Sequence, residues 1–301
     1  MRKRLASAVA NLIERFTHAP VTAFKPAHGV EVRSLSDFIA ETANSRPDLA
    51  DVRNYNHQMI DIFGTLRTLK GKSLLDIGAS PHGFALERAL EVGVSYYCGV
   101  GLGVAKDVEL RTNSSRAHLV NLNAEHVPTA SESFDLIISL STFEHFFHPD
   151  VVLKEMHRVL RPGGAALVSF QPIWTSARGH HLHHLPDVCP LVPPWAHLYW
   201  TPERMRASLS PSWPAGASMT VDQVVNWIYH SDEINRLDIR QLRSFFQTSP
   251  LTIEWMTPLA DELTDRERAI AGELSATLPF SAEELRVKGF SALLVRNQSH
   301  E

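Results

Sequence analysis

The sequence is poor in cysteine and has no long apolar run. Its two cysteines, Cys98 and Cys189, are far apart and belong to no CxxC pair. We therefore expect neither a disulfide framework nor a cysteine zinc site, which suits a reducing compartment. No apolar stretch approaches the roughly 18 residues that a membrane-spanning helix needs. We expect a cytoplasmic protein that has no membrane partner.

No charge of one sign dominates the sequence. Its 29 lysines and arginines face 33 aspartates and glutamates, and the formal net charge is −4. A large nucleic-acid partner would require a basic face for its phosphates, so we expect none. The 301 residues, 44% of them hydrophobic, are enough for one large α/β domain with an addition. The oligomeric state stays open.

The basic opening segment, residues 1–16, is not typical of a secretory signal. Asn11, Glu14 and Arg15 interrupt the apolar stretch that such a signal needs. Its apolar residues share one helical face, which predicts an amphipathic helix docked on the main domain. A membrane-surface or targeting role is the alternative. We assign residues 1–70 to an N-terminal helical segment, with a second helix over residues 54–69.

Short apolar runs alternate with helical stretches from Ser73 onward. Nearly continuous apolar strands that are separated by helices indicate a parallel sheet covered on both faces. The expected strands before the insertion are 73–78, 95–101, 117–122, 134–140 and 165–170, and those after it are 251–255 and 289–295. The fold class predicted is α/β, a Rossmann-like doubly wound sheet of seven mostly parallel strands, which binds its ligand at the carboxyl ends of the strands.

The segment 171–230 has a different composition. It contains five of the six tryptophans, eight of the eighteen prolines and six of the sixteen histidines. This is too aromatic for a linker and too broken by proline for regular strand–helix units. We interpret it as an insertion after strand five that covers the substrate. The main domain then comprises residues 71–170 and 231–298.

The turn after the first expected strand carries the strongest functional signal. In SLLDIGASPHGF, an aspartate at the strand end is followed by two glycines, a serine and a helix. Glycine lets the backbone approach a ligand closely, and the helix start offers free N–H groups to an anion. A dinucleotide would use the same geometry, so the turn alone does not distinguish NAD from S-adenosylmethionine.

Four stretches resemble the class I S-adenosylmethionine-dependent methyltransferases, of the small-molecule domain type. They are LLDIGASPHGF, LNAEHVP, SFDLIISLSTFEHF and LKEMHRVLRPGGAALVSF, between residues 73 and 170. The last two are the more specific, because a glutamate–histidine pair follows strand four and an RVLxPGG turn precedes strand five. NAD-binding domains do not show that pair. The resemblance implies S-adenosylmethionine as cofactor.

The resemblance also implies positions for the cofactor. The residues that would surround its methionine part are Asp76, Gly78, Ser80 and Gly83. Asn123 would face the adenine amino group beside the backbone of Ala124, although it could instead cap the following turn. Ser139 and Leu140 would line the site after strand four. Glu144 and His145 would stand near its mouth, unless they only begin a surface helix.

Two positions depart from the family pattern. The family usually has an acidic residue at the end of strand two to hold the ribose hydroxyls, and this chain has Gly101 there. Either the backbone or Asp107 would then hold the ribose, or the affinity for the cofactor would be weakened. The first loop is one residue longer than the common form, with Ser80 where glycine is frequent. GASPxGF also resembles ribosomal RNA 2′-O-methyltransferases, but the lysines and the aspartate after strand four that those enzymes need are not matched here.

A histidine cluster in the insertion supplies candidate proton acceptors. ARGHHLHHLPD contains four histidines, of which His180 and His181 are the favoured candidates for a general base. His145 is the second candidate, because strand four brings it near the methyl donor. A helical stretch would place His180 and His184 at metal-binding spacing, but we assign no metal. A solvated polar loop is the alternative.

Methyl transfer from a sulfonium mainly requires alignment, exclusion of water and sometimes removal of a proton. We therefore expect a methyltransferase acting on a small-molecule acceptor, O-directed, such as a natural product, a sugar or a quinone-like compound. Aromatic side chains of the insertion would line the acceptor pocket or form a packed subcore: Trp174, Trp195, Tyr199 and Trp200. The alternatives are a non-catalytic Rossmann-like binding protein and a nicotinamide-dependent enzyme.

Overall fold

The computed structural model describes residues 31–34, 36–38, 49–102, 108–111 and 115–298. The amphipathic helix expected for residues 1–16 lies outside the described residues. Every helix in the described ranges is too short or too polar to cross a membrane.

The described chain forms a mixed α/β fold around one nine-stranded sheet, whose order is β1-β4-β5-β3-β2-β6-β7-β9-β8. The strands are β1 (Glu31–Ser34), β2 (Ser73–Ile77), β3 (Tyr96–Val100), β4 (Val108–Arg111), β5 (Arg116–Val120), β6 (Phe134–Leu140), β7 (Leu160–Phe170), β8 (Thr252–Ala260) and β9 (Val287–Val295). The five central strands from β5 to β7 are parallel, and β9 pairs with β7 in the antiparallel sense.

The prediction of seven strands was wrong by two. The seven expected strands lie side by side, and β4 and β1 extend the sheet beyond β5. β4 pairs antiparallel with β5, and β1 pairs parallel with β4. Both added strands have only four residues with little apolar character, EVRS and VELR. Such short strands form because a neighbouring strand offers hydrogen bonds, and the sequence pattern does not predict them.

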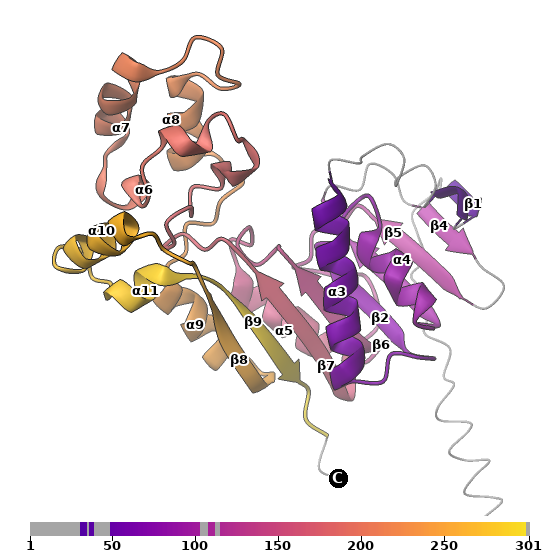
Figure 1. The fold of residues 1–301 in the computed structure, drawn as a ribbon. Helices are drawn as coiled ribbons and strands as arrows, with labels where there is room; N and C mark the ends of the chain where they lie inside the picture. Colours follow the sequence, from indigo (N-terminus) through magenta and orange to yellow (C-terminus); the bar gives the residue numbers. More distant parts are fainter. Residues whose placement is uncertain (1–30, 35, 39–48, 103–107, 112–114, 299–301) are drawn as a thin grey trace, which may run out of the picture.

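Helices cover both faces of the sheet (Figure 1). α3 (Ala50–Leu66) and α4 (Phe84–Glu91) pack on one face, and α5 (Pro149–Val159) and α9 (Ile239–Gln247) on the other. Alternate residues of β2 point to opposite faces, so Leu74 belongs to the first core and Leu75 to the second. All five residues of β2 are buried. This double coverage explains why the strand reads as a continuous apolar run.

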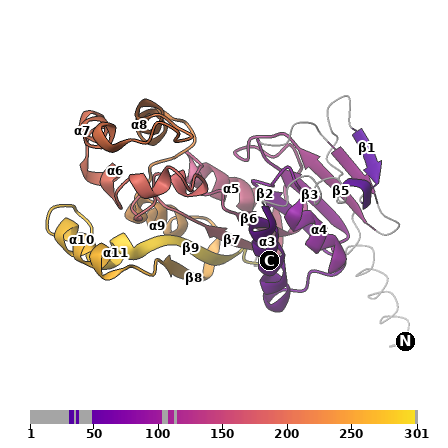
Figure 2. The same ribbon diagram turned by 45° about the horizontal axis from the view of Figure 1, so that its top comes forward.

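The segment between β7 and α9 forms a separate small core outside the sheet. Its elements are η2 (Leu182–His184), η3 (Cys189–Leu191), α6 (Ala196–Tyr199), α7 (Pro202–Leu209), η4 (Ser210–Ser212) and α8 (Val221–His230). Figures 1 and 2 show it as a compact unit beyond the end of the sheet where β7 leads into it. Its buried side chains include Leu182, Met205 and Ile228. This cluster is its own hydrophobic core.

The remaining helices join the insertion to the sheet. α10 (Asp265–Ser275) and α11 (Ala282–Arg286) lie between β8 and β9, and each begins with a capping box that satisfies its first N–H groups. Trp195 of the insertion is fully buried against Leu274 and Leu285 of these two helices. The insertion is therefore anchored to the main domain by apolar packing.

Candidate functional site

A cavity of about 710 Å³ opens at the carboxyl ends of the central strands. Its volume falls in the range of roughly 300–1,000 Å³ that small-molecule sites occupy. The loops after four neighbouring strands meet there: 78–81 after β2, 100–102 after β3, 122–125 after β5 and 141–147 after β6. β2 and β6 are the strands between which the strand order reverses. This is the switch point at which doubly wound sheets bind ligands.

The loop after β2 has a backbone that a side chain would disturb. Gly78 has φ +84°, and a Cβ there would lie 2.1 Å from the side chain of Thr142. Its N–H and that of Ala79 both donate to the carbonyl of Val100, at 2.8 and 3.0 Å. Gly83 closes the loop with φ +65° and is the residue before α4. The loop is thereby held open toward the cavity.

Gly101 has a packing reason that the sequence did not show. A Cβ at this position would lie 2.6 Å from the carbonyl oxygen of Ala79, so the loop after β2 occupies the space that a side chain would need. An acidic side chain therefore does not fit at this strand end. Asp107, the other candidate for holding the ribose, lies outside the described residues. The backbone of Gly101 still lines the cavity.

Asp76 lies behind the loop. Its side chain is buried, accepts a hydrogen bond from the Tyr97 hydroxyl, and is not among the described residues that line the cavity. Burial raises the pKa of Asp76 to about 7, although the hydrogen bond from Tyr97 opposes this shift. Its position suits support of the loop from below. Ser80, by contrast, lines the cavity, and its hydroxyl accepts the His82 N–H at 3.2 Å.

Asn123 and Ala124 line the side of the cavity next to β5. The Asn123 Oδ1 accepts the N–H of Glu125 at 3.0 Å. This is the turn-capping role left open from the sequence, and it holds the side chain at the cavity wall. Because an amide oxygen has two lone pairs, the same atom can accept a second hydrogen bond from a ligand.

Ser139 and Leu140 lie in the core, before the cavity begins. The Ser139 hydroxyl is fully buried and donates to the carbonyl of Ile77 at 2.9 Å, which ties β6 to β2. Leu140 packs in the core with α3 and α4. The described lining from this strand starts at Ser141 and Thr142. The lining after strand four therefore begins later in the sequence than expected, at Ser141 and not at Ser139.

Glu144 and His145 point to different environments. Glu144 is 2% exposed, and its Oε1 accepts the N–H of Gln171 at 3.3 Å. Burial raises the pKa of Glu144 to about 8. His145 is exposed, lines the cavity, and its Nδ1 hydrogen-bonds the carbonyl of Glu233. Burial of Glu144 is inconsistent with the alternative of a surface helix start for this pair.

The four histidines of the insertion divide into two groups. His180 and His181 are buried, whereas His183 and His184 are exposed. His181 lies beside His145, with ring centroids 5.1 Å apart. Residues 182–184 form a short 3₁₀ turn, so the helical spacing of His180 and His184 is not realised. Among the described residues, no group of three or more histidine, cysteine or acidic side chains could hold a metal ion.

The tryptophans of the insertion serve its packing. Trp174 and Trp200 pack against the insertion core, and Trp195 and Tyr199 pack with α10 and α11. None of the four is among the described residues of the cavity wall. Their placement corresponds to the packed subcore that the sequence left open as an alternative.

Several wall residues were missed from the sequence. Phe146 and Phe147 follow His145, and Asp232 and Glu233 come from the connection between α8 and α9. A loop pair such as Asp232–Glu233 carries no sequence signal, because only the fold brings it across the cavity. Three carboxylate residues line the wall, with no lysine or arginine among the described lining residues: Glu125, Asp232 and Glu233. Such a wall favours a cationic ligand over an anionic one.

Helix α3 contributes a further polar contact at the same edge of the sheet. The Tyr55 hydroxyl donates to Ser169 Oγ at 2.9 Å, at the end of β7. Burial raises the pKa of Tyr55. The charge of Glu144 also raises this pKa, whereas hydrogen bonding with Ser141 lowers it. The sequence indicated only a helix here, so its approach to the site was not predicted.

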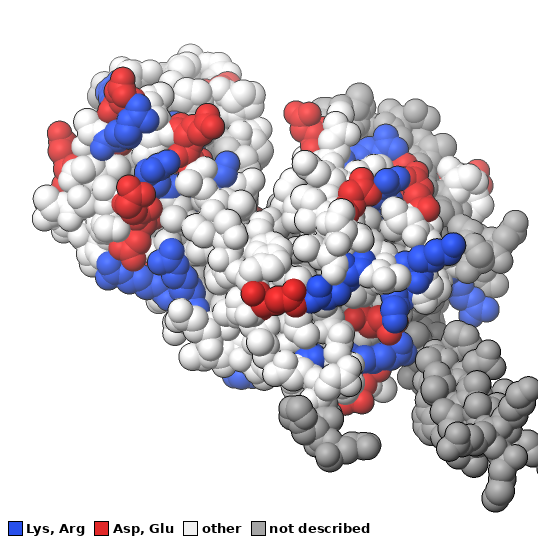
Figure 3. All heavy atoms as spheres, turned by 60° about the horizontal axis from the view of Figure 1, so that its bottom comes forward, with Lys and Arg blue, Asp and Glu red and all other residues white. Residues whose placement is uncertain are grey.

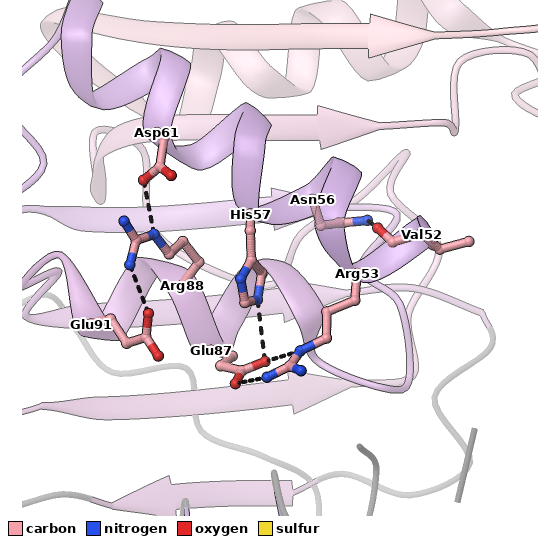
Figure 4. Close-up of polar contacts among 8 residues, drawn as sticks. All are labelled: Val52, Arg53, Asn56, His57, Asp61, Glu87, Arg88 and Glu91. Atoms are coloured by element: carbon pink, nitrogen blue, oxygen red, sulfur yellow. Dashed lines mark hydrogen bonds and ion pairs between the residues drawn. The ribbon is translucent and has the colours of Figure 1, made fainter. Parts of the chain in front are cut away.

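Ion pairs fix α3 against α4, the helix that follows the loop 78–83 (Figure 4). Arg53 binds both oxygens of the largely buried Glu87, its Nε at 2.8 Å, and His57 Nε2 lies 3.2 Å from the same carboxylate. Burial raises the pKa of Glu87, but the hydrogen bonds and the charges of Arg53 and His57 together outweigh burial and leave the pKa lowered. Arg88 adds an exposed contact with Asp61 at 2.8 Å. The contacts hold the start of α4 in place.

Comparisons with known proteins identify the central part of the chain. Residues 75–168 match the family described as a methyltransferase domain. The chain is 32% identical over 120 residues to an uncharacterized methyltransferase of Mycobacterium ulcerans, a match that covers 38% of this chain and 44% of that protein. A ubiquinone/menaquinone biosynthesis C-methyltransferase of Nitrosospira multiformis is 30% identical over 154 residues, which cover 48% of this chain and 62% of that protein.

The matches thus span less than two thirds of either relative. Among solved structures, an S-adenosylmethionine-dependent methyltransferase from Mesorhizobium loti aligns with 78% of this chain and 96% of its own, at 16% identity and a TM-score of 0.46. Residues 75–168 are therefore similar to a methyltransferase domain. The resemblance stated from the four sequence stretches is confirmed.

Proposed function

We propose that the whole chain is an S-adenosylmethionine-dependent methyltransferase that methylates an oxygen of a small-molecule acceptor. The observation that carries the proposal is the open cavity at the switch point, where the loops after β2, β3, β5 and β6 meet beside the methyltransferase motif. A non-catalytic protein is less favoured, because the described residues leave an open cavity beside the loop after β2.

The loop and the wall fit the cofactor. The backbone of residues 78–81 would hold its amino-acid part, and the N–H groups at the start of α4 suit a carboxylate. Asn123 and Ala124 would contact its adenine ring. The carboxylates of the wall suit the positive charge of a sulfonium. When bound, the cofactor supplies a methyl group on an already activated carbon.

The protein's own residues would align the acceptor and remove its proton. His181 is the favoured proton acceptor, because its ring lies beside that of His145, which lines the cavity. His180 is less favoured, because its Nδ1 already accepts the Leu182 N–H. Phe146 and Phe147 would exclude water from the mouth.

The proposal keeps the partner and location expected from the sequence. The carboxylates of the wall disfavour a phosphate-bearing nucleic acid, which supports a small-molecule acceptor. Both cysteines are free, Cys98 buried and Cys189 partly buried, which suits a reducing compartment such as the cytoplasm.

Calorimetry of the full chain tests the proposal. S-adenosylmethionine and S-adenosylhomocysteine should bind with micromolar dissociation constants, and NAD should not bind. The absence of binding by either sulfur compound would favour the non-catalytic alternative. Binding of NAD alone would favour a nicotinamide enzyme. Binding followed by no turnover with any extract of small molecules would also reject the activity.

A further inference from the structure

Unpartnered polar atoms are concentrated in the insertion and at the strand ends that lead into it. Among the described residues, the buried side-chain atoms without a hydrogen-bond partner are Glu144 Oε2, Gln171 Oε1, Thr175 Oγ1, Arg178 Nη1, His180 Nε2, His181 Nε2, His197 Nδ1 and Trp200 Nε1. All come from the end of β6, the end of β7 or the insertion. Buried polar groups are nearly always paired in folded proteins, so a cluster of exceptions points to a missing ligand or ordered water.

The hydrogen bonds of His181 determine its tautomer. Its Nδ1 lies 2.8 Å from the carbonyl of Gly179, and a carbonyl oxygen only accepts. Nδ1 therefore carries the proton, and Nε2 of the neutral ring is a free hydrogen-bond acceptor. This atom is buried and has no partner. A ligand that reaches it must therefore donate a hydrogen bond.

His145 has the same tautomer in its neutral form. Its Nδ1 hydrogen-bonds the carbonyl of Glu233, which leaves Nε2 as the acceptor. The two rings differ in exposure: His181 is 5% exposed, whereas His145 is exposed and lines the cavity. The ring centroids are 5.1 Å apart, so the buried acceptor atom of His181 lies next to a ring that is exposed to solvent, that of His145.

The charges near the pair disfavour an anionic ligand. Glu125, Asp232 and Glu233 line the cavity, without a lysine or arginine among its described lining residues. The guanidinium of Arg178 is not among the described lining residues and pairs with Glu267 at 3.4 Å. A carboxylate or phosphate group on the acceptor would therefore meet like charge without a compensating cation.

We infer that the methyl acceptor is a molecule without an anionic group whose hydroxyl donates to Nε2 of His181, and that His145 passes the released proton to solvent. The inference rests on the proposed function. The acceptor oxygen forms a bond to the methyl carbon as the carbon–sulfur bond breaks, and the electron pair of that bond stays on sulfur. The O–H bond breaks, and its proton moves to His181 Nε2.

The basicity of His181 fits a hydroxyl better than an amine. Burial lowers the pKa of His181 to about 3. Such a ring does not remove a proton from an alkylammonium group, whose lone pair must be free before attack. A hydroxyl can attack while protonated, and it becomes strongly acidic as its oxygen gains the methyl group. A weak base is then sufficient.

The experiment uses methyl-tritiated S-adenosylmethionine and the small-molecule extract of the source cells. Labelled products are passed over anion and cation exchangers at neutral pH. We expect the labelled product to pass through the anion exchanger, whereas unreacted S-adenosylmethionine is retained on the cation exchanger. Retention of the product on the anion exchanger would overturn the inference of an acceptor without an anionic group. No labelled product from a chain that binds S-adenosylhomocysteine would instead reject the proposed function.

Variants test the histidine pair with the same extract. His181→Ala should lower the initial rate of labelling at least about a hundredfold, whereas the exposed control His230→Ala should stay within about twofold. His145→Ala should lower the initial rate about tenfold, and added imidazole should restore rate. Imidazole would not restore the rate if the role of His145 were purely structural. Equal rates in wild type and His181→Ala, or no imidazole rescue, would overturn the relay.

Histidine ¹⁵N spectra give a readout that is independent of turnover. The resonances of His181 are those that are present in wild type and missing in His181→Ala. With S-adenosylhomocysteine bound at pH 6, they should be those of a neutral ring protonated at Nδ1. A ring protonated at Nε2 would contradict the assignment.

Discussion

At the residue scale, the cofactor loop is shaped by positions where a side chain does not fit. Gly78 combines a positive φ with close contact to Thr142, and Gly101 is covered by the backbone of Ala79. Glycine is needed at the first because other residues are strained in that conformation, and at the second because of space. The missing acid at the end of β3 is thus a consequence of packing.

Gly78→Ala should weaken binding of S-adenosylhomocysteine by at least about tenfold, equivalent to about 1.4 kcal/mol. The new methyl group overlaps Thr142, so the loop must shift away from its cavity position. Calorimetry measures the change. Gly216→Ala is the control, because a Cβ there meets nothing within 4 Å and its φ is ordinary. Similar affinities in all three proteins would show that the loop does not hold the cofactor.

Glu144 makes a prediction about pH. Its pKa in the folded chain is raised to about 8 from 4.5. The protonated Glu144 carboxyl therefore contributes its full stabilisation below pH 4.5. This contribution is lost as the pH rises through 8, by about 1.4 kcal/mol per pH unit. Urea unfolding of Glu144→Gln should show a shallower decline between pH 5 and 8 than wild type. The decline that remains in the variant should reflect Asp76, whose raised pKa acts in the same sense. Parallel pH profiles would refute the buried, protonated carboxyl.

At the scale of elements, α3 supports the site through its contacts with α4. The contact of Arg53 and His57 with Glu87 joins the N-terminal half of α3 to the helix that begins at Gly83 (Figure 4). α3 also carries Tyr55, whose hydroxyl donates to Ser169 at the end of β7. The segment before the methyltransferase motif therefore belongs to the architecture of the site.

Arg53→Ala should lower the free energy of unfolding by about 1–3 kcal/mol, because it leaves the largely buried Glu87 carboxylate without its main partner. Arg88→Ala removes exposed ion pairs and should cost less than about 1 kcal/mol. Urea unfolding of both variants measures the difference. The double variant Arg53→Ala/Glu87→Gln should recover part of the loss. Equal effects of the two single variants would contradict the role of Arg53.

At the scale of the whole molecule, the site and the insertion have separate cores. The cavity is built by the sheet edge, whereas the insertion packs around its own apolar cluster and against α10 and α11. On the face seen in Figure 3, acidic and basic side chains are interspersed over both parts. Ligand binding should therefore act on the loops at the sheet edge more than on the insertion core.

Saturating S-adenosylhomocysteine, at a hundred times its dissociation constant, should stabilise the fold by about 2.7 kcal/mol. Hydrogen exchange should slow in the loops 78–83, 100–102, 122–125 and 141–147. The amides of α7 and α8 should exchange at nearly unchanged rates. Protection confined to α7 and α8 would place the ligand elsewhere.

The amino-acid sequence by itself determined the strand–helix alternation, the glycine turn after β2 and the resemblance to methyltransferases. These follow from local patterns, since continuous apolar runs mark strands buried on both faces and glycines mark the turn. The tertiary structure alone decided that β1 and β4 extend the sheet, that Asp76 lies behind the loop, and that His181 lies beside His145. Each depends on contacts between residues distant in the chain, and a linear pattern does not contain that information.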